Sequence, residues 1–243
     1  MGTQIKIIGS GSKGNCYLLE TSTETLMLEA GMPLKDVRAQ MDFGKSLAGV
    51  LVSHQHGDHA GHLAEVSTLG AAIYTNSAVR SIMPDDVQRC IHVMDVEATC
   101  AVGGFKVVPF ELKHDVECYG FLIWHEELGK LLFVTDTTSC DYNFNGLSHI
   151  MIEANYDDAI LMKNVEDDIV PVSVAERVRR SHMELTDTKL FLEGVDGSNL
   201  KDVILIHLSG KNSRREAFCE AVRRIVGVPV YAAEAGKTLL FLK

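Results

Sequence analysis

Four side chains that can bind a metal ion stand within six consecutive residues, directly after an apolar segment. The apolar run 47–53 leads into His-Gln-His-Gly-Asp-His at 54–59. A helix would spread these four side chains around its axis, so we expect a loop at the end of a buried strand. Imidazole and carboxylate groups are zinc ligands, and a hydrolytic site keeps one position open for water. Because the donors of one such turn cannot easily all reach a single ion, the segment predicts a site for two ions.

The rest of the chain predicts one α/β domain. Its 243 residues are 46% hydrophobic and 23% charged, which is an ordinary globular balance. We see no repeat, low-complexity tract or linker, so we expect a single domain over residues 1–243. Both halves contain short strand-like segments with a few helices between them, a pattern typical of a layered α/β sandwich.

Periodicity and turn residues predict where the strands and helices lie. We expect strands at 4–8, 16–20, 25–28, 47–53, 72–75, 105–110, 119–124, 130–135, 150–153, 203–207 and 238–242. We expect helices at 34–41, 62–69, 77–83, 172–182 and 214–226. Residues 9–14 match GxGxxG, but a strand-like segment follows them rather than a helix, so we expect a tight turn and no dinucleotide site.

Features that the sequence lacks predict the cellular compartment of the protein. No apolar stretch is long enough to span a bilayer, and residues 1–8 lack the pattern of a signal peptide. The six cysteines form no CxxC pair, so we expect buried free thiols. Together these features predict a cytoplasmic protein without a membrane partner.

The net charge of −10 does not favour general nucleic-acid binding, which normally needs a basic surface. Positive side chains nevertheless gather near the candidate site in the sequence. We expect some of them to meet phosphate groups, and to make binding weaken with salt. The candidates are Lys13, Arg177, Arg179, Arg180, Lys211, Arg214 and Arg215.

Three further residues of ligand type follow later strands. His114 comes after the strand 105–110, Asp136 ends the strand 131–135, and His207 ends the strand 203–206. Each of them alone would more often be a structural residue. Their joint placement at strand ends favours a role in metal binding.

The HxHxDH segment, followed in order by His114, Asp136 and His207, resembles the signature of the metallo-β-lactamase superfamily. The resemblance spans nearly the whole chain and implies an αββα sandwich of two mixed sheets covered by helices. It also implies two divalent ions that activate water for hydrolysis, zinc by default, with manganese or iron compatible. One ion would take His54, His56 and His114, the other Asp58, His59 and His207, and Asp136 would bridge them.

A further histidine indicates which branch of the superfamily the chain resembles. His182 resembles the extra histidine of tRNase Z and related phosphodiesterases, which implies that it assists the leaving oxygen or holds the scissile phosphate. The 71 residues from Asp136 to His207 are too few for a β-CASP insertion, and the chain has no flavodoxin-like domain. Because few residues follow His207, we expect no helical region like that of glyoxalase II.

Three strings resemble the WalJ (YycJ)-type branch, a group of bacterial and phage DNA exonucleases that cut from the 5′ end and have a proposed part in mismatch repair. They are Gly-Ser-Gly-Ser-Lys-Gly-Asn-Cys-Tyr at 9–17, Glu-Ala-Asn-Tyr-Asp at 153–157 and His-Leu-Ser at 207–209. The chain departs from the branch at Glu29, where Asp is usual, at 183–184 after His182, and at 210–213.

These resemblances imply a two-metal phosphodiesterase that acts on nucleic acid, as a DNA exonuclease, with Asp58 and His182 in catalysis. Two alternatives stay open. One is a small-molecule metallohydrolase for a cyclic phosphodiester, thioester or lactone, and the other is a metal-stabilised binding module without turnover. The predicted substrate contacts are Ser12, Lys13, Asn15, Asn155, Arg180 and Lys211.

Overall fold

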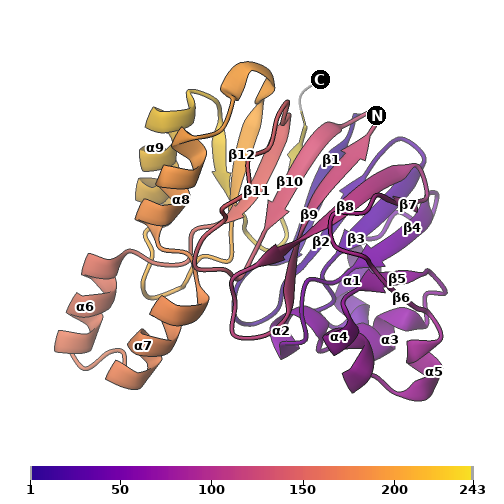
Figure 1. Ribbon diagram of the computed structural model, residues 1–243, viewed down its shortest axis with the longest axis horizontal. Helices are drawn as coiled ribbons and strands as arrows, with labels where there is room; N and C mark the ends of the chain where they lie inside the picture. The colour runs from indigo at the N-terminus through magenta and orange to yellow at the C-terminus, as the bar shows by residue number, and fades with distance from the viewer. Residues whose placement is uncertain (1, 242–243) are drawn as a thin grey trace.

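Two seven-stranded sheets lie face to face at the centre of the molecule, as the computed structural model, which describes residues 2–241, shows (Figure 1). The first sheet has the order β14 (Thr238–Leu240), β1 (Gln4–Gly9), β2 (Cys16–Glu20), β3 (Glu24–Leu28), β4 (Ser46–Leu51), β5 (Ile73–Thr75) and β6 (Ile91–Val93). The second has the order β13 (Val230–Ala232), β12 (Asp202–Ile206), β11 (His149–Glu153), β10 (Gly129–Val134), β9 (Cys118–His125), β8 (Phe105–Leu112) and β7 (Cys100–Val102).

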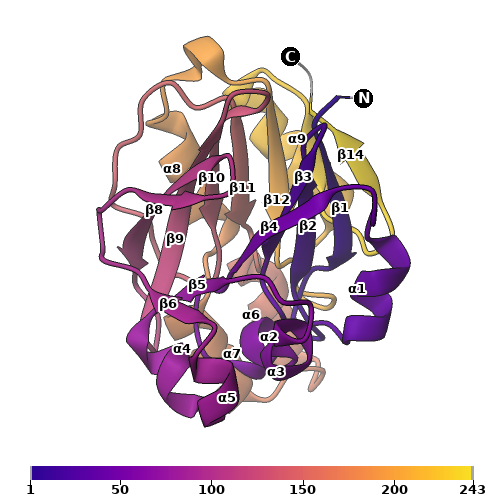
Figure 2. The ribbon, with the colours of Figure 1, turned by 90° about the vertical axis from the view of Figure 1, so that its right-hand side faces the viewer.

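Helices cover the outer face of each sheet, so the predicted αββα sandwich of two mixed sheets is confirmed (Figure 2). The first sheet is covered by α1 (Leu34–Gln40), α2 (Gly57–Ala60), α3 (Leu63–Ser67), α4 (Ser77–Ile82) and α5 (Asp85–Gln88). The second is covered by α8 (Leu185–Glu193) and α9 (Arg215–Val226). The hairpin of α6 (Asp158–Glu166) and α7 (Val172–Ser181) projects beyond this sheet at the lower left of Figure 1.

The core is layered because successive side chains of a strand point to opposite faces. Ile5 and Ile7 of β1 pack between the sheets with Phe121 and Phe133 of the second sheet. Leu18 and its neighbours on the other face pack beneath the helices of the first sheet. A separate small cluster, which includes Leu161, Ala175 and Val178, holds α6 against α7.

Every predicted strand and helix has a counterpart, although residue 242 of the predicted strand 238–242 lies outside the described residues. The sequence analysis missed β6, β7, β13, α2, α5, α6 and α8. The predicted loop at 54–59 is only partly correct, because Asp58 and His59 lie on the single helical turn α2, whereas His54 and His56 precede it. Helices α6 and α8 have weak amphipathic patterns, so tertiary packing contributes most of their stability. A cap signal was nevertheless present before α6, where the Asp157 side chain accepts a hydrogen bond from the Ile160 N–H.

The fold gathers the loops that carry the predicted site at one end of the sandwich. Strands β10, β11 and β12 are parallel neighbours, so their carboxyl ends meet at the same edge. The loop after β4 reaches this edge from the opposite sheet, and α2–α3 and α6–α7 lie on its two sides (Figure 1). None of the helices within residues 2–241 is long and apolar enough to cross a membrane. The cysteines are free, and Cys16, Cys118 and Cys219 are buried as predicted, whereas the other three are partly exposed.

Candidate metal centre

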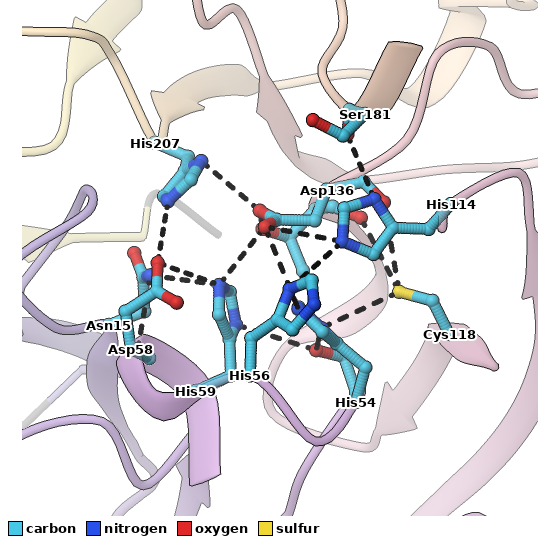
Figure 3. Close-up of polar contacts among 12 residues, drawn as sticks. Asn15, His54, His56, Asp58, His59, His114, Cys118, Asp136, Ser181 and His207 are labelled. Carbon is cyan, nitrogen blue, oxygen red and sulfur yellow. Dashed lines mark hydrogen bonds and ion pairs between the residues drawn. The ribbon is translucent and has the colours of Figure 1, made fainter. Parts of the chain in front are cut away.

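The seven predicted ligands come together from four separate segments at this end of the sandwich (Figure 3). Their donor atoms form two groups, and within each group every atom lies within 4.8 Å of the others. The groups are His54, His56, His114 and Asp136, and Asp58, His59, Asp136 and His207. Asp136 belongs to both.

Three imidazoles of the first group point their nitrogens at one another. His56 Nδ1 lies 3.1 Å from His54 Nε2 and 3.2 Å from His114 Nε2. Asp136 Oδ2 lies 3.7 Å from His54 Nε2 and 3.9 Å from His114 Nε2. Atoms at these separations can all lie about 2 Å from one shared ion, so this donor set fits a divalent cation.

The donor atoms of the second group also lie close to one another. Asp58 Oδ2 lies 3.3 Å from His207 Nε2 and 3.6 Å from His59 Nε2. Asp136 Oδ2 lies 3.4 Å from His59 Nε2, and Asp136 Oδ1 lies 3.1 Å from His207 Nδ1. The side chains present therefore fit a second cation beside the first.

The outward nitrogens of the imidazoles have partners of their own, which orient each ring. His54 Nδ1 lies 2.9 Å from Ser53 Oγ, and His114 Nδ1 donates to the Ser181 carbonyl at 2.9 Å. His59 Nδ1 lies 3.4 Å from Glu29 Oε1, and His56 Nε2 lies 3.5 Å from Asp115 Oδ1. Contacts of this kind select the tautomer that presents the other nitrogen to an ion.

Backbone strain coincides with the site. Glu29, Asp136 and His207 have φ values of 64°, 42° and 53°, in the left-handed region that residues other than glycine seldom adopt. Each lies at a turn just after a strand, and the tight turn aims its side chain into the cluster. Strain of this kind persists where the surrounding structure holds it, and it is concentrated at functional sites.

The ionisable side chains of the cluster shift one another's pKa values. Although burial opposes ionisation, His207 and His59 hold the pKa of Asp136 well below its usual value. Burial disfavours the His207 cation, but Asp136, Asp58 and Glu153 raise the pKa of His207 to about 10. Burial and the neighbouring His59 keep the pKa of His54 well below its usual value. A buried carboxylate at the centre of such a cluster attracts positive charge, whether protons or metal ions.

Glu153, which the sequence analysis did not assign to the site, links two of its histidines. Its side chain is fully buried at the end of β11, and Oε1 lies 2.7 Å from His182 Nδ1 and 3.0 Å from His207 Nδ1. Oε2 accepts hydrogen bonds from the Thr137 and Met183 N–H groups. The available signal was the one used for Asp136 and His207, an ionisable residue at the end of an apolar strand.

A pocket of about 350 Å³ opens over the cluster. It is lined by Ser12, His56, Gly57, Asp58, His114, Asp115, Asp136, Arg177, Ser181, His182 and His207. Of the six predicted substrate contacts only Ser12 is in this lining, and of the cations predicted to meet phosphate only Arg177 is. His182, predicted to act in catalysis, also lines it.

The other predicted substrate contacts lie elsewhere. Asn15 and Asn155 are only 1% and 6% exposed. Asn15 Nδ2 lies 3.0 Å from His59 Nε2, and Asn155 Nδ2 donates to the His207 carbonyl at 2.9 Å. Because these two amides are buried against the histidines, we expect them to orient the rings rather than to contact substrate. Lys13, Arg180 and Lys211 are not in the pocket lining.

Gly31 allows three loops of the site to pack without side chains between them. Its N–H donates to the Asn15 carbonyl, and the Asn15 N–H donates to the Asp58 carbonyl at 2.7 Å. A Cβ at Gly31 would lie 1.8 Å from the Asp58 carbonyl oxygen. The backbone that carries Asp58 must therefore move if this glycine is replaced.

We expect Gly31→Ala to lower the free energy of unfolding by about 3 kcal/mol, since overpacking against backbone cannot be relieved by a side-chain rotation. The midpoint of thermal unfolding should fall by about 6–12 °C. Gly197→Ala is the control, because a Cβ there meets nothing within 4 Å. Equal stability of the two variants in denaturant titrations would contradict the proposed close packing.

Sequence comparison agrees with this architecture. The family described as "Beta-lactamase superfamily domain" matches residues 17–208. An exodeoxyribonuclease YycJ of Bacillus anthracis is 25% identical, over 93% of this chain and 90% of the relative. An exodeoxyribonuclease WalJ of Streptococcus pneumoniae is 24% identical, over 89% of this chain and 85% of the relative.

Solved structures show the same fold at lower identity. The metallo-β-lactamase fold protein YhfI of Bacillus subtilis superposes with a TM-score of 0.74 and 15% identity, over 98% of this chain and 100% of the other. The short form of human tRNase Z superposes with a TM-score of 0.64 and 17% identity, over 99% of this chain and 100% of the other. With the family match over residues 17–208, these findings establish that the chain belongs to the β-lactamase superfamily domain family and has the metallo-β-lactamase fold.

Proposed function

We propose that this protein is a two-metal phosphodiesterase that acts on nucleic acid, as a DNA exonuclease. The observation that supports the proposal is His182, which lines the same pocket as members of both groups of metal donors and whose Nδ1 lies 2.7 Å from the buried Glu153 carboxylate. The exodeoxyribonuclease names of the relatives from Bacillus anthracis and Streptococcus pneumoniae support the choice of DNA.

His54, His56 and His114 would hold one ion, Asp58, His59 and His207 the other, and Asp136 would contact both. Two bound divalent ions, zinc by our first expectation, would supply positive charge that activates water and stabilises charge on a phosphodiester. Asp58 also lines the pocket and its side chain is 23% exposed. The carboxylate oxygen of Asp58 that is not used as a ligand would therefore be available to accept a proton from a water molecule in the pocket.

His182 is placed to act on the leaving oxygen. Its Nδ1 is bonded to Glu153, so Nε2 is the nitrogen left to meet a substrate. A phosphodiester that is cut releases an alkoxide, which requires a proton, and an imidazolium at this position can donate one. A thiolate leaving group does not need that proton, so the His182–Glu153 pair favours phosphodiester over thioester chemistry.

The decisive assay uses the metal-loaded protein and end-labelled single- and double-stranded DNA and RNA, with bis-p-nitrophenyl phosphate and a thioester as comparison substrates. We expect DNA to be shortened progressively from one end. Hydrolysis of the thioester with every phosphodiester left intact would refute a phosphodiesterase, and metal binding without any hydrolysis would indicate a binding module.

A further inference from the structure

Arg177 is the one lysine or arginine among the residues that line the pocket. It lies on α7 with its side chain exposed, and no ion pair of its guanidinium occurs within residues 2–241. Three carboxylates, those of Asp58, Asp115 and Asp136, line the same pocket. An arginine that is paired with none of them remains available to an anion from solution.

Other cations predicted to meet phosphate are engaged elsewhere. Arg179 makes a two-pronged contact with Asp158, with Nε and Nη2 each 2.7 Å from a carboxylate oxygen. Arg215 Nη1 lies 3.0 Å from Glu234 Oε1. Lys211 Nζ donates to the Ile169 carbonyl. These side chains therefore have less capacity than Arg177 to bind a phosphate at the pocket.

The backbone of Arg177 is anchored to the metal centre. Ser181 Oγ donates to the Arg177 carbonyl at 2.8 Å, and the Ser181 carbonyl accepts from His114 Nδ1 at 2.9 Å. Arg177 and Ser181 are four residues apart and share one face of α7. Ala175 and Val178 fix the opposite side of the helix against α6. The base of the exposed Arg177 side chain is therefore held in place relative to the proposed ligand His114.

We infer that Arg177 binds the backbone phosphate next to the one that is cut, with Ser12 also available among the lining residues. This inference rests on the proposed function and adds to it that the substrate carries at least two phosphates in one chain. A guanidinium suits this task because its fork of N–H groups matches two phosphate oxygens. A single phosphodiester lacks the group that Arg177 would hold.

The test compares Arg177→Gln and Arg177→Lys with Arg180→Gln in the full-length protein. Arg180 lies on the same helix and is also exposed, but it does not line the pocket, and both Gln variants remove one charge from α7. We expect Arg177→Gln to lower kcat/KM on a DNA oligonucleotide at least tenfold more than on bis-p-nitrophenyl phosphate. Its loss on the oligonucleotide should exceed that of Arg180→Gln at least fivefold, and Arg177→Lys should recover part of it.

Binding gives an independent readout. With a chelator present to prevent cleavage, the anisotropy of a fluorescent single-stranded oligonucleotide is followed as salt is raised. Loss of one phosphate contact should reduce the slope of log Kd against log salt by about 0.7 in Arg177→Gln.

Equal slopes and equal rates for Arg177→Gln and Arg180→Gln would overturn the inference, as would equal losses by Arg177→Gln on both substrates. Failure of the proposed function would look different: the unaltered protein would cut no oligonucleotide. In that case the slopes still decide whether Arg177 binds a phosphate chain.

Discussion

Replacing Asp136 by asparagine should lower kcat on DNA at least about 1000-fold, which corresponds to about 4 kcal/mol of lost transition-state stabilisation. Asp136 is the residue common to both groups of donors, and its two oxygens face histidines of different segments. Asparagine has a similar volume and tolerates the positive φ of 42° at this position. The loss would therefore report the missing charge rather than a misfolded loop.

The number of metal ions bound per chain tests the same role of Asp136 without an activity assay. Mass spectrometry of the purified Asp136→Asn protein should find fewer than two ions per chain, whereas the unaltered protein should hold two. Asp202→Asn is the control, because Asp202 is a buried carboxylate that contacts a histidine, His149, at the other end of β12. The control should keep both ions and full turnover. Two retained ions and unchanged kcat in Asp136→Asn would refute the bridging role.

Replacing His182 by alanine should lower kcat on DNA by about 100- to 10000-fold, the range expected when a general acid is lost. His182 belongs to neither proposed ligand set, so the ion content should stay at two. Hydrolysis of the thioester, if any occurs in the unaltered protein, should change little, because its leaving group needs no proton. The measurements are kcat on both substrates and metal content.

The outcomes separate three roles for His182. Loss of an ion together with activity would make it a ligand, which its position within 4.8 Å of donors of Asp136, Glu153 and His207 allows. Full activity on DNA would remove it from the mechanism. His92→Ala is the control, since His92 is exposed on β6 and stacks on Tyr74.

Residues near one another in the sequence determined much of the fold and of the candidate metal centre. The apolar run 47–53 followed by the donors of 54–59 defines half of the metal centre, because a strand and the turn after it are local structures. His114, Asp136 and His207 were found by the same rule, and alternation of apolar residues placed most strands. The family resemblance then supplied the layered fold and the expected pairing of the donors.

Tertiary structure alone decided which polar side chains are buried and which cations line the pocket. Glu153 contacts His207, 54 residues away, and Asn15 contacts His59, 44 residues away, so no local pattern could show that these groups support the histidines. Packing of Ala175 and Val178 against α6 sets the rotation of α7, and that rotation selects Arg177 rather than Arg180 for the pocket. Contacts of this range depend on how whole elements pack, which the chemistry of neighbouring residues does not specify.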